Sequence, residues 1–313
     1  MAMGVDALGA GRAAQAGKRP FVRVPEKART TRPFFSFEFF PPRDDDAERA
    51  LFATIEALTP LNPGFVSITY GAGGSTRVRT VELAKRLRSE LGFDVVAHLT
   101  CAGATVDELR ATLNDLRRAG IENVLALRGD PPRGSETFAP SPGGLEHAND
   151  LIALIKAEFG FCVGGAAYPE KHPEAVSFDA DLAALSRKVA AGAEFLVTQL
   201  FFDNARYVEF VERARQWGIT VPIFPGIMPI TNYEQIDRFT RGCGATIPGG
   251  LREALEARRD DPQAVIDLGV AYATLQVADL LARGAPGIHF YTLNRSPATR
   301  AVVSALLAAR SSW

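Results

Sequence analysis

Short runs of β-branched and aromatic residues recur along the chain after residue 33, and segments with a helical pattern separate them. In the helical segments apolar residues are spaced i, i+4 and i+7, as at Leu51, Ile55 and Leu58, which predicts one buried face. The predicted strands cover residues 34–40, 65–71, 94–100, 123–129, 162–168, 195–202, 221–227 and 287–293. The glycines expected at helix C-caps, where φ is positive, are Gly120, Gly160, Gly192, Gly218 and Gly284.

Eight strand-helix units in roughly 280 residues match the size and periodicity of an α/β (β/α)8 barrel, the TIM barrel. A doubly wound open sheet is the alternative, but the first strand-to-helix turn has no GxGxxG fingerprint for a dinucleotide. Residues 232–283 are long enough for an extra helix before the eighth strand. We therefore expect a single catalytic domain over residues 34–313.

Residues 1–33 have a different composition, with seven Lys or Arg and only Asp6 and Glu26 as acids. We expect a disordered N-terminal extension that does not join the core. Its arginine-rich, acid-poor character also resembles a transit peptide, and this alternative stays open.

The overall composition is that of a soluble globular protein: 47% of the 313 residues are hydrophobic, and 35 basic side chains face 36 acidic ones. The near-neutral charge gives no general attraction to nucleic acid or membranes, so an anionic ligand needs a local basic cluster. No uninterrupted apolar run approaches the roughly 18 residues that span a bilayer. Three widely spaced cysteines, Cys101, Cys162 and Cys243, favour reduced thiols in the cytoplasm and no metal site.

The first predicted strand places a carboxylate among five phenylalanines, in Phe34-Phe35-Ser36-Phe37-Glu38-Phe39-Phe40. Because a strand alternates its faces, Ser36 and Glu38 point one way while Phe35, Phe37 and Phe39 point toward packed core. An ionised carboxylate is costly in apolar surroundings, so we expect a raised pKa for Glu38. Such a group holds a proton near neutral pH and can donate it to a substrate.

Other polar residues also follow the predicted strands, and in a barrel they would share the face that carries active sites. These residues are Thr69, Tyr70, His98, Arg128, Asp130, Tyr168, His172, Gln199, Tyr291 and Arg295. Each alone has a structural interpretation, such as a hydrogen-bonded barrel histidine at His98, but their coincidence at seven of eight strand ends favours a site. Arg187 and Lys188, on the helix before the sixth strand, could clamp a phosphate; a solvated helix face is the alternative.

Eight sequence blocks resemble methylenetetrahydrofolate reductases, in the short form that lacks a regulatory domain. The blocks are FSFEFFPP (35–42), SITYGAGGST (67–76), AHLTC (97–101), ALRGDPP (126–132), AAYPEKHPEA (166–175), TQLFFD (198–203), PGIMPI (225–230) and HFYTLNRSPAT (289–299). The resemblance implies a flavoprotein oxidoreductase that uses NADH or NADPH to reduce 5,10-methylenetetrahydrofolate to 5-methyltetrahydrofolate for methionine biosynthesis. It also implies a homo-oligomer, either a dimer or a tetramer.

The resemblance further implies roles for individual residues. Glu38 would protonate N10 of the folate, and Asp130 would lie near both flavin and pterin. The implied cofactor-binding residues, for FAD and the nicotinamide, are Thr69, Tyr70, Ala72, His98, Arg128, Gly129, Asp130, Ala148, Tyr168, His172, Asp181, Arg187 and Lys188. The implied substrate-binding residues are Asp130, Gln199, Gln235, Phe239, Tyr291, Leu293 and Arg295.

Two positions differ from some family members: Ala184 stands where some have an amide near the adenosine of FAD, and His147 stands where some have a tyrosine beside the flavin. Two other functions stay open from the residues. One is a folate-dependent methyltransferase or demethylase on the same barrel, which needs no flavin. The other is a non-catalytic folate-binding protein, which needs no buried acid at Glu38.

Overall fold

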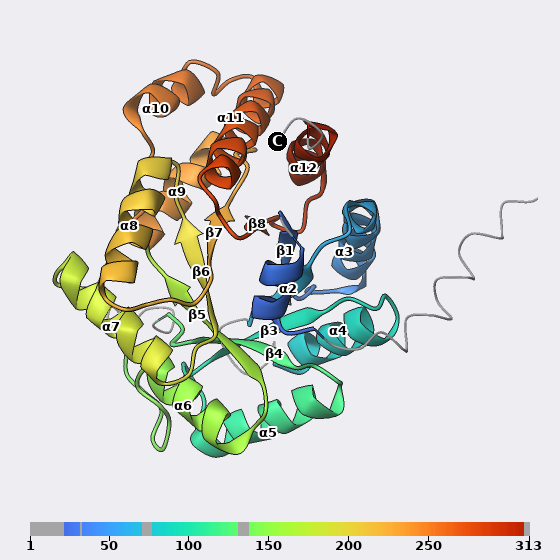
Figure 1. The fold of residues 1–313 in the computed structure, drawn as a ribbon. Coiled ribbons are helices and arrows are strands. Elements are labelled where there is room, and N and C mark those ends of the chain that lie inside the picture. The colour runs from blue at the N-terminus through green and yellow to red at the C-terminus, as the bar shows by residue number, and fades with distance from the viewer. Residues whose placement is uncertain (1–21, 32, 71–76, 131–137, 310–313) are drawn as a thin grey trace, which may run out of the picture.

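Eight parallel strands close into a barrel in the order β1 to β8, with helices around the outside (Figure 1). The computed structural model describes residues 22–31, 33–70, 77–130 and 138–309. The strands are β1 (Phe35–Phe39), β2 (Phe65–Ile68), β3 (Val95–Thr100), β4 (Asn123–Leu127), β5 (Cys162–Ala167), β6 (Phe195–Leu200), β7 (Ile223–Ile227) and β8 (Ile288–Tyr291). All eight predicted strands are therefore present, and the predicted TIM barrel is confirmed.

The helices alternate with the strands until β7. The helical elements are α2 (Val24–Thr30), α3 (Asp45–Leu58), the 3-10 helix η2 (Thr59–Leu61), α4 (Arg77–Ser89), α5 (Val106–Arg118), α6 (Ala148–Glu158), α7 (Phe178–Ala190), α8 (Asn204–Gln216), α9 (Tyr233–Cys243), α10 (Gly249–Glu256), α11 (Pro262–Ala282) and α12 (Pro297–Ala308). Three helices, α9 to α11, lie between β7 and β8, so the expected extra helix is accompanied by a second one.

Local sequence explains where most helices begin and end. Thr105 and Glu108 form a capping box at the start of α5, and the Ser177 hydroxyl accepts a backbone hydrogen bond at the start of α7. The predicted positive φ is confirmed at four glycines: Gly120, Gly192, Gly218 and Gly284. The prediction is wrong at Gly160, because α6 ends instead through Phe159 in an extended conformation, with φ of −136°.

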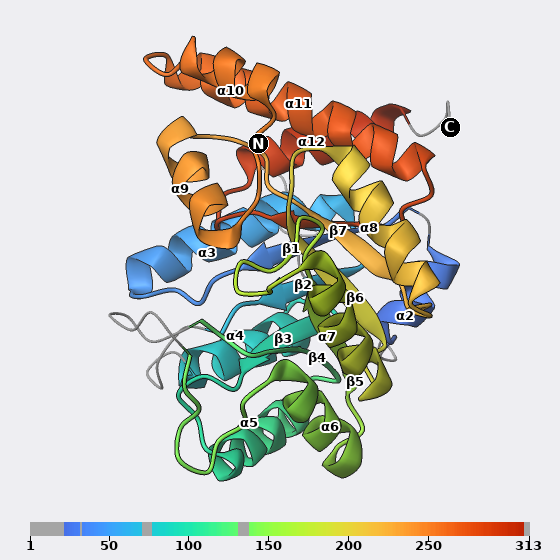
Figure 2. The same cartoon turned by 90° about the vertical axis from the view of Figure 1, so that its left-hand side faces the viewer.

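The expected disordered extension is wrong for the segment next to the barrel. Helix α2 joins the core, with Val24 and Ala28 completely or almost completely buried. Arg23 pairs with Glu194 at 3.1 Å, and Lys27 pairs with Asp94. Figure 2 shows α2 at one end of the barrel and α9 at the other. Residues 1–21 lie outside the described residues.

The apolar core has three parts, and the smallest of them lies around the ends of β6 and β7 with α9 and α10, and includes Phe202, Met228 and Ile236. The largest one fills the space between the outer face of the barrel and the surrounding helices, and it includes Phe37, Leu113 and Phe290. The second part lies against α2 and contains Phe34, Phe65, Phe195 and Phe224. This second cluster closes the amino-terminal end of the barrel and leaves the carboxyl end for polar side chains.

Helix α11 is 21 residues long and, by length and composition alone, apolar enough to span a membrane. Asp267 and Asp279 interrupt it, which is why the sequence shows no continuous apolar run. Core helices of globular proteins have the same properties, and α11 packs along α12 and α8 in the outer ring.

Candidate active site

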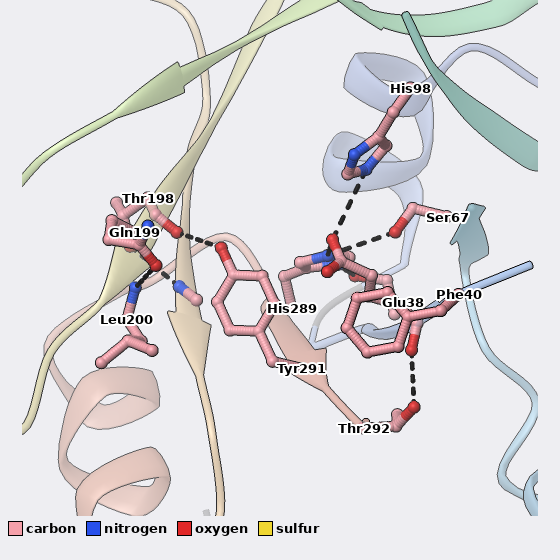
Figure 3. Close-up of polar contacts among 12 residues, drawn as sticks. Glu38, Phe40, Ser67, His98, Thr198, Gln199, Leu200, His289, Tyr291 and Thr292 are labelled. Atoms are coloured by element: carbon pink, nitrogen blue, oxygen red, sulfur yellow. Dashed lines mark hydrogen bonds and ion pairs between the residues drawn. The ribbon is translucent and has the colours of Figure 1, made fainter. Parts of the chain in front are cut away.

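Strand register brings a group of polar side chains together inside the barrel. Glu38 on β1 is paired with Ser67 on β2 and with Tyr291 on β8, while Ser36 is paired with His289. Paired residues on neighbouring strands point to the same face of the sheet. These side chains therefore converge in the interior of the barrel (Figure 3).

Glu38 lies between two histidines (Figure 3). Its Oε2 atom is 3.4 Å from Nε2 of His289 and 3.4 Å from Nε2 of His98. The residue is only 8% exposed, and its backbone carbonyl accepts a hydrogen bond from the Thr292 hydroxyl at 2.5 Å. The structure thus confirms that Glu38 is buried at the end of its strand.

The expected direction of the Glu38 pKa shift is wrong. Burial raises the pKa, but the hydrogen bond with His289 and the charges of His98 and His289 lower it by more, so the net pKa lies below its ordinary value of 4.5. The sequence showed only the apolar neighbours on the same strand. The two histidines come from β3 and β8, which are distant in sequence.

The two histidines have different environments. His98 Nε2 makes no hydrogen bond within the described part of the chain, and burial lowers the pKa of its imidazole. His289 Nδ1 lies 2.8 Å from the Ser36 hydroxyl, and the His289 ring stacks on Phe65 with centroids 5.6 Å apart. His289 was not among the predicted site residues. Alternation along β8 could have found it, because an inward-facing Tyr291 implies an inward-facing residue 289.

Tyr291 crosses the mouth of the barrel toward β6. Its hydroxyl donates to the Thr198 carbonyl at 2.6 Å, and burial raises its pKa well above the ordinary value. Gly226 on β7 allows this approach, since a Cβ there would lie 2.3 Å from the Thr198 carbonyl oxygen and 2.6 Å from the Tyr291 ring. Next to Thr198, the Gln199 side-chain oxygen accepts a hydrogen bond from the Leu200 amide at 2.8 Å.

The segment after β4 combines an ion pair, a glycine and a carboxylate. Arg128 makes a bidentate pair with Glu174, at 2.6 and 2.7 Å, and lies 4.8 Å from the centre of the Phe138 ring. Gly129 has φ of +88°, and a Cβ there would lie 2.7 Å from that of Ala102. Only glycine therefore fits at this position. Asp130 follows with an exposed side chain.

The loop after β5 is held by hydrogen bonds to its own backbone. The His172 amide donates to Asp181 at 2.9 Å, and His172 Nδ1 accepts from the Glu174 amide at 3.1 Å. The Tyr168 and His172 rings meet edge to face with centroids 4.6 Å apart. Lys171 stabilises this loop by donating to the carbonyls of His172 and Ala175.

The predicted phosphate clamp on α7 is only partly formed. Lys188 donates to the Ala166 carbonyl at 2.9 Å, at the end of β5, and burial lowers its pKa to about 8. Arg187 is exposed, and neighbouring residues on a helix do not face the same way. Lys188 and the His172 loop thus meet near Asp181, and the side chain of the adjacent Arg187 is exposed.

The remaining predicted residues lie on several different elements. Gln235, Phe239 and Leu293 line one small pocket between β7, α9 and the segment after β8, and Arg295 is exposed just beyond it. Thr69 and Tyr70 follow β2. Ala148 is buried at the start of α6, next to the half-exposed His147, and Ala184 lies on α7. Ala72 lies outside the described residues.

Comparisons with known proteins show the family to which the chain belongs. The family model for methylenetetrahydrofolate reductase matches residues 23–307. Methylenetetrahydrofolate reductase (NADH) 1 of Arabidopsis thaliana is 42% identical over 271 residues, which cover 83% of this chain and 46% of the plant protein. The 5,10-methylenetetrahydrofolate reductase of Escherichia coli is 41% identical over 272 residues, covering 87% of this chain and 90% of the bacterial protein.

The chain spans about half the length of the plant relatives that it matches. Among solved structures, a Clostridium thermocellum protein described as binding two copies of 5-methyl-5,6,7,8-tetrahydrofolic acid superposes with a TM-score of 0.60. The alignment covers 89% of this chain and 95% of that one, at 16% identity. This likeness supports the fold alone.

Proposed function

The chain belongs to the methylenetetrahydrofolate reductase family, and on this premise we propose that it reduces 5,10-methylenetetrahydrofolate to 5-methyltetrahydrofolate with NADH as reductant. The bacterial relative of nearly equal length supports the reaction, and the names of the plant relatives support NADH. The structural observation that carries the proposal is the buried carboxylate of Glu38, held between two histidines at the carboxyl end of the barrel.

We propose FAD as the bound cofactor, and the residues present fit it. His98 Nε2 is a buried polar atom with no hydrogen-bond partner among the described residues, so a polar atom of a bound ring could contact it at the carboxyl end of β3. Lys188 offers an ammonium group beside the His172 loop, where a pyrophosphate would find a cation and backbone donors. The proposed FAD-binding residues are Tyr70, Ala72, His98, Arg128, Gly129, Asp130, Ala148, Tyr168, His172, Asp181, Arg187 and Lys188. Bound FAD supplies the two-electron hydride chemistry that side chains lack.

The side chains of this protein supply position and a proton. Glu38 would deliver a proton to folate N10, which opens the five-membered ring to an iminium that can accept hydride. The exposed Asp130 carboxylate and the Gln199 amide would hold the pterin by hydrogen bonds. The pocket lined by Gln235, Phe239 and Leu293 would hold apolar parts of the folate, with Tyr291 and Arg295 beside it. Thr69 and Gln199 would contact the nicotinamide.

An absorbance experiment tests the proposal. We expect the purified protein to be yellow, to be bleached by NADH without oxygen, and to regain its colour when 5,10-methylenetetrahydrofolate is added. Parallel addition of NADPH measures the choice of reductant. A colourless protein that binds folate without turnover would support the non-catalytic alternative, and a colourless protein that transfers a methyl group would support the methyltransferase.

We also propose a cytoplasmic homo-oligomer, either a dimer or a tetramer. The three cysteines are unpaired, as expected in a reducing compartment. The oligomer rests on the family resemblance, and light scattering of the purified protein measures it directly.

A further inference from the structure

Both ring nitrogens of His289 have hydrogen-bond partners. Nδ1 lies 2.8 Å from the Ser36 hydroxyl, and Nε2 lies 3.4 Å from Glu38 Oε2 and 3.4 Å from the Ser67 hydroxyl. The side chain is only 1% exposed. The Phe65 ring stacks on one face of the imidazole, and the Tyr291 ring meets it edge to face at 5.4 Å. The imidazole is therefore fixed in one orientation beside Glu38.

The hydrogen bonds of the Ser36 hydroxyl determine which nitrogen of the His289 ring carries a proton. Ser36 Oγ lies 3.3 Å from the Ile288 carbonyl, which can only accept a hydrogen bond. When Ser36 donates its single proton there, it accepts from a protonated Nδ1 of His289. With Nδ1 protonated, a proton that lies between His289 Nε2 and Glu38 Oε2 is an additional one that the ring and the carboxyl group share, and the Ser67 hydroxyl lies 3.4 Å from the same nitrogen.

His98 is less suited than His289 to carry this proton. Its Nε2 is equally close to Glu38 but makes no hydrogen bond within the described part of the chain. A buried cation without hydrogen-bond partners is costly, whereas the His289 ring has Ser36, Ser67 and Glu38 around it.

We propose that His289 is a positioning residue that holds, through its hydrogen bond to Glu38, the proton that Glu38 delivers to the substrate. This inference rests on the proposed function. It explains how a carboxyl group that is mainly ionised on its own can act as an acid, because the pair as a unit retains one proton. The 3.4 Å separation suits such a role, since catalytic hydrogen bonds are often long before a ligand closes the site.

The proton transfer balances as follows. In the starting state one proton lies between His289 Nε2 and Glu38 Oε2. The bond to this proton breaks and a new N–H bond forms at folate N10, which leaves Glu38 as a carboxylate and His289 as a neutral ring. Solvent returns a proton to the pair after the product leaves. No oxidant or reductant takes part in this step.

The pH dependence of the pair involves every titratable group that faces the ring. These groups are Glu38 on β1, His98 on β3 and Tyr291 on β8; Ser36 and Ser67 are polar but do not titrate in the working range. Because Tyr291 has a raised pKa and His98 a lowered one, both stay neutral near pH 7. The proton that changes place there is the one shared by His289 and Glu38.

The first test compares His289→Gln with wild type in stopped-flow measurements of the two half-reactions. An amide can hydrogen-bond to Glu38 but cannot hold the extra proton. We expect flavin reduction by NADH to be unchanged and folate reduction to fall by about tenfold or more. The decline of folate reduction with rising pH should also move to lower pH. Ser36→Ala should also move this decline to lower pH, by a smaller amount.

Phe290→Leu is the matched control for packing. Phe290 is the next residue on β8, is fully buried and belongs to the outer core on the opposite face. This variant should lose stability and leave the pH profile of folate reduction unchanged. A His289→Gln profile identical to wild type, or a parallel fall of both half-reactions, would overturn the inference.

The second test measures the protonation of the His289 ring nitrogens by ¹⁵N NMR of protein labelled at histidine. The chain has only four histidines, so the His289 signals can be assigned by their loss in His289→Gln. We expect both His289 nitrogens to be protonated at pH 7, and one to lose its proton in Glu38→Gln. A neutral ring in wild type that does not respond to Glu38→Gln would exclude a shared proton. This test stands even when wild type fails to reduce folate, an outcome that refutes only the proposed function.

Discussion

The two ends of the barrel interior differ in chemistry although the same strands build both. At the amino-terminal end the inward positions are Phe34, Phe65, Phe195 and Phe224, whose rings pack with centroids 5.2 to 6.5 Å apart. Further along the same strands, toward the carboxyl ends, the inward positions become Ser36 and Glu38, Ser67 and Thr69, Val197 and Gln199, and Gly226 and Met228. Two to four residues along β1 and β2 therefore change an apolar layer into a polar one, whereas β7 continues with Gly226 and Met228.

This difference separates stability from chemistry. The phenylalanine cluster and α2 exclude water from one end, so the buried carboxylate and histidines at the other end rest on a rigid base. Burying Glu38 among polar groups contributes little net stability, because desolvation opposes each favourable contact. Substitutions at the amino-terminal end, which we call the closed end, should therefore affect folding. Substitutions at the carboxyl end, which we call the open end, should affect ligand binding and turnover.

The largest effect on stability is expected at the closed end. Phe224→Ala removes a ring that contacts Phe34, Phe65 and Phe195, and it should lower the free energy of unfolding by about 3–5 kcal/mol. Denaturant unfolding measures this loss, and both half-reactions per folded molecule should stay near wild type. Leu275→Ala, at a position 73% exposed on α11, is the control and should change stability by less than about 0.5 kcal/mol. A large change in turnover for Phe224→Ala would mean that the two ends are not separable.

Glu38→Gln is the corresponding substitution at the open end. It keeps the size of the side chain but removes its proton, so folate reduction should fall by roughly a hundredfold or more. In the proposed reaction, reduction of flavin by NADH needs no proton from Glu38 and should stay near the wild-type rate. Glu56→Gln, on the exposed side of α3, should change neither rate. Equal losses in both half-reactions would remove Glu38 from the acid role.

Lys188, at the open end, should have a smaller effect, and this effect should depend on pH. Burial lowers its pKa from 10.5 to about 8, so the folded protein releases this proton before the unfolded chain does. Between about pH 8 and 10.5 the unfolded state binds more protons, and the contribution of this group to stability therefore rises with pH in the FAD-free protein. FAD affinity should move in the opposite direction and weaken above about pH 8, as the cation is lost.

Lys188→Ala should abolish both pH effects and weaken FAD binding by about tenfold or more at pH 7. Thermal unfolding without FAD and a fluorescence titration with FAD measure the two quantities. Lys85→Ala, an exposed lysine on α4, is the matched control. An FAD affinity that is unchanged in Lys188→Ala would show that Lys188 does not hold the cofactor.

The sequence predicts the strands and their inward faces, but it does not predict the contacts between side chains at the open end. Strand periodicity identified all eight strands and showed that Glu38 shares a face with Ser36, since both properties are local. The neighbours of Glu38 depend instead on register between β1, β3 and β8. The sequence predicted His98 as a site residue at the end of its own strand. Only the closed barrel shows that His98 and His289 both approach Glu38, and that they lower its pKa.

The missed elements have a similar cause. Residues 24–30 are rich in charge, and their burial depends on a small number of apolar contacts with distant strands, at Val24 and Ala28. The helix end at Phe159 differs from the predicted glycine cap because an extended residue can also stop a helix. For α2, tertiary contacts rather than local propensity therefore decide the outcome.

The smallest expected effect concerns how α2 is fastened to the closed end. Lys27 also donates to the Gly64 carbonyl, and its side chain is 20% exposed, against 10% for its partner Asp94. In a double-mutant cycle of Lys27→Met and Asp94→Asn, we expect a coupling of about 1–2 kcal/mol, between the values typical of exposed and buried pairs. The more exposed pair Arg110–Glu158 should couple more weakly than Lys27–Asp94. Equal coupling in the two pairs would mean that burial does not strengthen the Lys27–Asp94 pair. Turnover should be unchanged in every variant because α2 lies at the opposite end from Glu38.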